Sequence, residues 1–265
     1  MDPSRYEVNC SILFAELDLL ERPAAAKAAG FDAVEFWWPF PEPVPGDRDV
    51  DRFVRAVEDA GVSLVGLNFF GGDLPSGDRG VLSNPKRASE FVDNLDVAVG
   101  IGERLDCRAF NALYGNRVDG LDPAAQDGLA TENLVRAAKT AGRIGGTVLI
   151  EPISGVDAYP LKTAGDALAV IDRVRAEGAD NLALLFDIYH LVANGDDPDA
   201  LLAQHPEVIG HVQIADVPGR GEPGSGDIDF AHYFDKLDAV GYTGPIGLEY
   251  KPTGASADSF GWIGR

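Results

Sequence analysis

The segment LALLFDIYH, residues 182–190, decides the fold. Its first five residues form an unbroken apolar run, typical of a buried strand, which ends in the carboxylate Asp187 with the imidazole of His190 three residues later. An isolated buried charge is costly unless it is paired or bound to a metal ion. Three other segments of the chain end in the same way, which predicts a shared polar site.

The composition limits the classes of function. The chain has 265 residues, 45% of them apolar, and a net charge of −21, which disfavours nucleic acids and anionic membranes as partners. Cys10 and Cys107 are too few for a disulfide framework, and we expect both to be buried bystanders. Without a signal pattern or a long apolar run, the chain is expected to be soluble and cytoplasmic.

Eight strand-like segments alternate with helical patterns along the chain. The length and the short connections favour a closed parallel barrel, and we predict a single (β/α)8 TIM-barrel domain over residues 1–265. The helical pattern between the sixth and seventh strands is expected at residues 199–204, and an aromatic turn at residues 260–263. The expected strands are residues 8–14, 33–38, 63–70, 105–113, 147–153, 182–188, 209–215 and 245–250.

Oxygen-bearing side chains mark the ends of four successive predicted strands: Glu151, Asp187, Gln213 and Glu249. Reacting groups of such barrels lie at the C-terminal ends of the strands, so these four should converge. Any one carboxylate could instead be a helix cap or an ion-pair partner, but three together repel unless a cation neutralises them. Oxygen ligands without thiolate favour Mg²⁺ or Mn²⁺.

Several further residues lie near these strand ends, and the role of each has two interpretations. His190 is either a substrate contact or a surface histidine, and His211 either a core residue or a ligand. Glu35 and Asn68 lie at the ends of the second and third predicted strands, and each has either a functional or a structural role. The Gly-rich loop 216–227, with its single arginine, is either a mobile lid that clamps substrate or a plain surface loop.

Six segments of the chain resemble the xylose-isomerase-like barrel superfamily, and more closely the hydroxypyruvate isomerases. The similarity runs along nearly the whole chain. Its carriers are AAGFDAVEF (28–36), LIEP (149–152), FDIYH (186–190), HVQIA (211–215), PGRGEP (218–223) and the run from GY (241–242) to EYKP (249–252).

The resemblance implies roles for residues of this chain. It implies that the four strand-end residues bind a divalent metal, and that Glu151 and Glu249 act as the acid–base pair. Related ketose epimerases have a histidine where this chain has Gln213, which favours the hydroxypyruvate branch. The residues expected to contact substrate are His190, Arg220, Lys251, Glu222 and Asn68, with Arg220 or Lys251 meeting a substrate carboxylate.

The expected reaction is the interconversion of hydroxypyruvate and 2-hydroxy-3-oxopropanoate (tartronate semialdehyde) through an enediolate. Three alternatives stay open at this point: an isomerase or epimerase of a larger oxo-acid or ketose, a metal-dependent dehydratase of the same fold, and a non-catalytic barrel that binds a small acid. The expected partner is a small molecule, and association into a homo-oligomer is left open.

Overall fold

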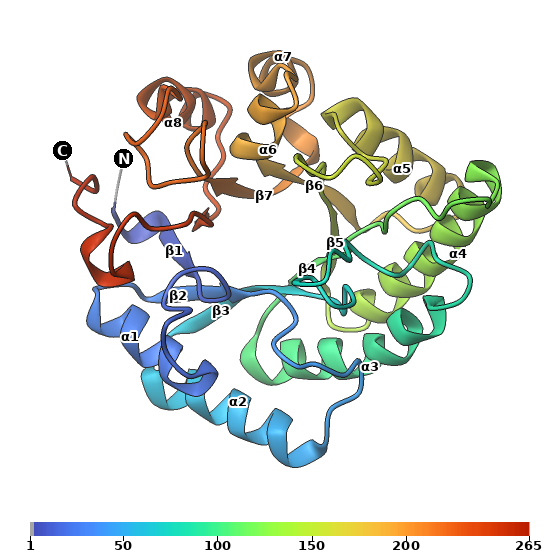
Figure 1. Ribbon diagram of the computed structural model, residues 1–265, viewed down its shortest axis with the longest axis horizontal. Helices are drawn as coiled ribbons and strands as arrows, with labels where there is room; N and C mark the ends of the chain where they lie inside the picture. Colours follow the sequence, from blue (N-terminus) through green and yellow to red (C-terminus); the bar gives the residue numbers. More distant parts are fainter. Residues whose placement is uncertain (1–2, 265) are drawn as a thin grey trace.

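The computed structural model describes residues 3–264, in which eight parallel strands close into a barrel and the helices surround them (Figure 1). Each strand pairs with its neighbours in chain order, and β1 closes the ring against β8. The strands are β1 (Tyr6–Asn9), β2 (Ala33–Phe36), β3 (Ser63–Asn68), β4 (Ala109–Asn111), β5 (Thr147–Ile150), β6 (Leu182–Asp187), β7 (Ile209–Ile214) and β8 (Ile246–Leu248).

The helices connect successive strands, as a (β/α)8 barrel requires. Two of them, α6 and α7, share the connection between β6 and β7. The helices are α1 (Arg22–Ala28), α2 (Asp47–Ala60), α3 (Ala88–Leu105), α4 (Pro123–Gly142), α5 (Ala164–Ala176), α6 (Ile188–Ala193), α7 (Pro198–Gln204) and α8 (Phe230–Ala239). None of the helices within residues 3–264 is long and apolar enough to cross a membrane.

The predicted barrel and the eight strands in their order are confirmed, but several predicted bounds were wrong. The first strand ends at Asn9 and not at residue 14, and the fourth is only Ala109–Asn111 within the predicted range 105–113. Helix α6 was missed entirely. Residues 188–193 continue the apolar character of β6, so the pattern does not show where the strand gives way to the helix.

The two ends of the described chain meet beside the closing strand pair. The ring of Tyr6 on β1 lies edge-on to Trp262, with centroids 5.1 Å apart, and Phe31 contacts Phe260 at 4.7 Å. These contacts follow the short 3₁₀ turn Ser256–Asp258. The C-terminal segment therefore covers the β1–β8 side of the barrel, with no α-helix between β8 and residue 264, in keeping with the aromatic turn expected at residues 260–263.

A loop between β3 and α3 packs against the segment after β4. Gly80 has φ +100°, and a Cβ there would overlap the carbonyl oxygen of Leu113. Gly77, in the same loop, has φ +107° but no heavy atom within 4 Å of such a Cβ. Of these two glycines, Gly80 alone is required both by the backbone conformation and by a close approach to another backbone segment.

We predict that Gly80→Ala destabilises the fold more than Gly77→Ala. Both changes place a side chain in an unfavourable backbone conformation, at a cost of about 1–3 kcal/mol, but only Gly80→Ala also forces backbone atoms apart. Chemical denaturation of the two variants measures the difference. Equal losses in the free energy of unfolding would show that the contact with Leu113 does not constrain this loop.

Candidate active site

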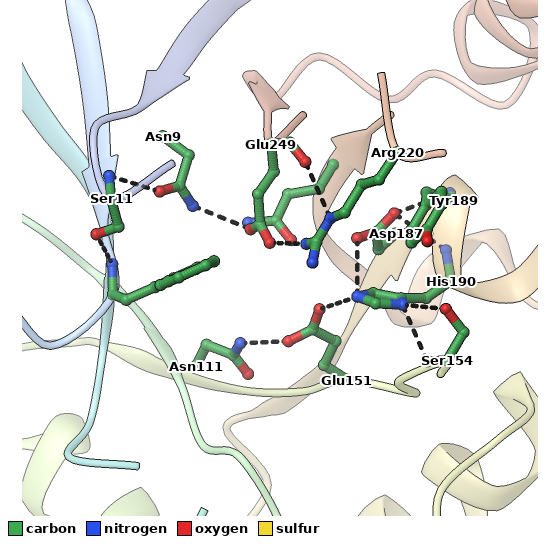
Figure 2. Close-up of polar contacts among 12 residues, drawn as sticks. Asn9, Ser11, Asn111, Glu151, Ser154, Asp187, Tyr189, His190, Arg220 and Glu249 are labelled. Atoms are coloured by element: carbon green, nitrogen blue, oxygen red, sulfur yellow. Dashed lines mark hydrogen bonds and ion pairs between the residues drawn. The ribbon is translucent and has the colours of Figure 1, made fainter. Parts of the chain in front are cut away.

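Four buried oxygen-bearing side chains gather at the C-terminal ends of β5 to β8. Glu151 and Glu249 come directly after β5 and β8, Asp187 ends β6, and Gln213 lies on β7 in register with Asp187. Each side chain belongs to a residue at most 4% exposed. In Figure 2 the three carboxylates point toward a common space that also holds His190 and Arg220.

Two oxygens of this set are buried without a hydrogen-bond partner among the described residues: Asp187 Oδ2 and Gln213 Oε1. The other oxygen of Asp187 accepts the N–H of Tyr189 at 2.8 Å and so caps α6. An unpartnered buried acceptor is destabilising, and a carboxylate more so than an amide. Glu151, Asp187 and His190 each bring one potential ligand atom within 4.8 Å of the others, and the two carboxylates among them suit a divalent cation that prefers oxygen ligands.

Glu151 and Glu249 are each held by an asparagine. Glu151 Oε2 accepts from Asn111 Nδ2 at 2.6 Å, and Glu249 Oε2 accepts from Asn9 Nδ2 at 2.9 Å. Burial, followed by the charge of Asp187, raises the pKa of Glu151 to about 8. Burial also raises the pKa of Glu249 well above its usual range, although the nearby Arg220 opposes this effect.

His190 is held as a neutral hydrogen-bond donor. The backbone N–H of Ser154 donates to His190 Nδ1 at 2.9 Å, so the ring proton must lie on Nε2. That nitrogen lies 3.8 Å from Glu151 Oε1 and 3.7 Å from Asp187 Oδ2. Burial and then the charge of Arg220 lower the pKa of His190 well below its usual value. This arrangement suits a donor to substrate oxygen better than a metal ligand.

Glu35, inside the barrel, orients residues of the site through hydrogen bonds. Its Oε1 accepts from both Gln213 Nε2, at 2.6 Å, and Asn9 Nδ2, at 2.9 Å. Because an amide presents its oxygen opposite its nitrogen, this contact turns Gln213 Oε1 away from Glu35. His211 Nε2 lies 2.9 Å from Glu35 Oε2 and 3.1 Å from Glu7 Oε1.

His211 therefore belongs to a buried cluster with Glu7 and Glu35 and does not line the pocket at the barrel mouth. Burial alone would lower the pKa of His211, but its hydrogen bond to Glu35 and its ion pair with Glu7 raise it to about 10. The three residues lie close enough to hold an ion. We interpret them as a buried ion-pair cluster, since one imidazole nitrogen already contacts both carboxylates.

A pocket of about 250 Å³ opens above these groups. Of the residues expected to contact substrate, Asn68, His190 and Arg220 line it. Lys251 is exposed outside this lining, and the carboxylate of Glu222 is bound by Thr253. The complete lining is Trp37, Asn68, Leu74, Pro75, Arg79, Leu113, Glu151, Ile153, Ser154, His190, Arg220 and Glu249.

Arg220 is already engaged within the protein. Its guanidinium is ion-paired with Glu249 Oε1 and lies over the ring of Tyr189, 5.3 Å from the centroid (Figure 2). The loop 216–227 that carries it is tied to buried Asp216, whose carboxylate accepts backbone N–H groups from residues 217, 224, 226 and 228. The loop therefore has its own internal support, which the sequence interpretation did not anticipate.

Sequence reasoning missed the asparagines that hold the two glutamates, and also Ser154 and Arg79. A usable signal existed for Asn9 and Asn111, because each is the last residue of its strand, as Asn68 and Asp187 are. The rule that selected the four oxygen-bearing residues would have found them, had the predicted strands not continued past their true ends.

Comparison with known proteins agrees with this architecture. Residues 23–265 match the family model described as "Xylose isomerase-like TIM barrel". The chain belongs to this family.

Several relatives within this family are isomerases by name. A Streptomyces coelicolor protein named as a candidate hydroxypyruvate isomerase is 52% identical, covering 98% of this chain and 95% of its own. Hydroxypyruvate isomerase of Escherichia coli is 32% identical, with 98% of each chain covered. The 2-oxo-tetronate isomerase of Cupriavidus necator is 34% identical, covering 98% of this chain and 97% of its own. The chain is thus an enzyme of the isomerase class, similar to hydroxypyruvate isomerase.

A solved structure supports the fold in detail. The crystal structure of a Brucella melitensis protein named "AP endonuclease, family 2" has a TM-score of 0.87 and 34% identity, covering 98% of this chain and 97% of that chain. The barrel described above is therefore shared along its whole length by a protein of experimentally determined structure.

We predict that Asp187→Asn weakens binding of Mn²⁺ by about tenfold or more, because the change removes the charge of a proposed ligand. The carboxamide oxygen still caps α6, so the thermal midpoint should change little. Isothermal titration calorimetry measures the affinity, and Asp59→Asn, an exposed site on α2, is the matched control. Unchanged Mn²⁺ affinity in Asp187→Asn would contradict the assignment.

Proposed function

We propose that this protein is a metal-assisted isomerase that interconverts hydroxypyruvate and 2-hydroxy-3-oxopropanoate. The observation that carries the proposal is the pair of buried carboxylates, Glu151 and Glu249, which line one pocket and both have raised pKa values. Relatives with hydroxypyruvate isomerase names over nearly the full chain support the choice of substrate.

The reaction needs two proton transfers at neighbouring carbons. A base removes a proton from C3 of hydroxypyruvate, which breaks the C3–H bond and leaves an enediolate. An acid then delivers a proton to C2, while the hydroxyl proton on O3 is lost and O2 gains one. Glu151 and Glu249 are the base and the acid, since a raised pKa lets a carboxyl hold a proton that it can then give to the substrate.

Other residues orient the reacting groups. The Nε2–H of His190 points toward the carboxylates and donates to a substrate oxygen. Asn111 and Asn9 fix the rotamers of the two glutamates, and Arg220 neutralises part of the charge on Glu249. Apolar side chains in the pocket lining, such as Leu113, limit the access of water to the enediolate.

A divalent cation, Mg²⁺ or Mn²⁺, fits the remaining acceptors. Glu151, Asp187, Gln213 and Glu249 would hold it, and the unpartnered oxygens of Asp187 and Gln213 are the structural reason. When bound, such an ion supplies a positive charge that stabilises the enediolate oxygens. A nucleic-acid substrate is disfavoured by the net charge of −21, although the Brucella melitensis protein of similar structure is named an endonuclease.

A longer oxo-acid is the second candidate substrate. The named relative from Cupriavidus necator, 2-oxo-tetronate isomerase, is about as similar to this chain as the Escherichia coli hydroxypyruvate isomerase is. A panel that compares hydroxypyruvate with 2-oxo-tetronate under the same conditions decides between them by their ratio of kcat/KM.

We predict that the protein, supplied with Mn²⁺ or Mg²⁺ in D₂O, catalyses deuterium incorporation at C3 of hydroxypyruvate and forms an aldehyde product. Glu151→Gln should lower kcat by about a hundredfold or more, because the amide cannot accept the proton. NMR spectroscopy measures both exchange and product. Glu103→Gln, an exposed site at the end of α3, is the matched control.

Two results would overturn the proposal. Absence of both deuterium exchange and aldehyde with the wild-type protein would show that hydroxypyruvate is not its substrate, and loss of water from the substrate would indicate a dehydratase. A Glu151→Gln variant with full turnover would show that the carboxylate pair does not carry the proton transfers.

A further inference from the structure

One cationic side chain of the pocket has no assigned role. Arg79 lies in the loop between β3 and α3 and lines the pocket together with Glu151, His190 and Glu249. Of the pocket-lining side chains, only Arg79 and Arg220 carry a positive charge. Since Arg220 is ion-paired with Glu249, its charge is already largely used within the protein.

Arg79, by contrast, is held only by neutral groups. Its Nη1 donates to the backbone carbonyls of Leu74, at 2.9 Å, and Asp78, at 2.5 Å. In the part of the chain that the structure describes, no carboxylate is ion-paired with Arg79, and Nε and Nη2 have no protein acceptor. The contacts to the two carbonyls fix one nitrogen of the guanidinium and leave the others to bind a ligand.

The surroundings strengthen an interaction with an anion. Leu74, Pro75 and Leu113 line the same pocket, and such apolar neighbours lower the local dielectric. The loop backbone is fixed as well, because Gly115 N donates to the carbonyl oxygen of Arg79 at 2.9 Å.

A substrate carboxylate needs such a group. The carboxylates of Glu151, Asp187 and Glu249 repel an anion, and Lys251, the other expected partner, is exposed outside the pocket lining. A guanidinium binds a carboxylate through two parallel N–H···O bonds, which fixes both position and orientation.

We propose that Arg79 binds the substrate carboxylate and thereby restricts the enzyme to small hydroxy- and oxo-acids over neutral sugars. This inference deepens the proposed function and rests on it for the identity of the reacting acid. Dihydroxyacetone is the matched neutral substrate, since it differs from hydroxypyruvate only by a hydroxymethyl group in place of the carboxylate.

The kinetic test compares the two substrates in Arg79→Met and in Arg55→Met, an exposed control on α2 that removes the same charge. Arg79→Met should lower kcat/KM for hydroxypyruvate relative to that for dihydroxyacetone by about tenfold or more, mainly through KM, because a charge-assisted pair is lost. Arg79→Lys, which retains the charge without the planar fork, should recover part of the selectivity. Arg55→Met should leave the ratio unchanged.

A purely structural role predicts another pattern. If Arg79 only holds Leu74 and Asp78, Arg79→Met would impair both substrates equally, and the unchanged ratio would overturn the proposal. Should Arg79→Met fail to fold, the ratio in Arg79→Lys decides, and a wild-type ratio there is evidence against the carboxylate contact.

A binding experiment separates this inference from the proposed reaction. Calorimetric titration with glycerate and with glycerol requires no turnover. Glycerate that binds the wild type, but binds Arg79→Met about tenfold or more weakly, supports the carboxylate contact even if hydroxypyruvate is not isomerised. Equal affinity in both proteins, or no binding of glycerate to the wild type, overturns it even if isomerisation is observed.

Discussion

The structure depends on how the charges of three buried carboxylates are compensated at one end of the barrel. Glu151, Asp187 and Glu249 come from three strand ends and are each at most 4% exposed. Burial and mutual repulsion would drive such groups toward the neutral form. Arg220 offsets part of the charge at Glu249, and a bound cation would compensate the rest. In the proposed reaction, the same compensation would let the two glutamates exchange protons with the substrate.

The polar residues inside the barrel, beneath the C-terminal ends of the strands, determine where the oxygen atoms of the candidate site point. Glu35 accepts hydrogen bonds from the side-chain amides of both Gln213 and Asn9, and the amide of Asn9 also donates to Glu249. One carboxylate on β2 therefore orients a proposed ligand on β7 and a proposed acid–base residue after β8. His211 contacts the other oxygen of Glu35 and keeps that carboxylate in place. This explains why polar residues occupy the barrel interior, where apolar packing would be more stable.

Much of this architecture could be predicted from the sequence, because polar residues interrupt apolar runs at the C-terminal ends of strands. The bounds of the strands could not be predicted, because the sequence stays apolar past the strand ends. Cys10 and Leu13, for example, follow β1 and are fully buried although they lie outside any strand. That continuation concealed Asn9 and, by the same cause, Asn111. Arg79 lies in a loop without periodicity, and only the fold brings it to the pocket. The N-cap role of Asp187 could not be predicted either, because the apolar residues after it do not show where the helix begins.

The central claim is that one divalent cation is bound by Glu151, Asp187, Gln213 and Glu249. Anomalous diffraction from crystals grown with Mn²⁺ tests it most directly, because the signal locates the ion independently of activity. The account predicts a single strong peak at the barrel mouth, within bonding distance of these four side chains. A peak confined to the cluster of Glu7, Glu35 and His211, or no peak at the mouth, would contradict it.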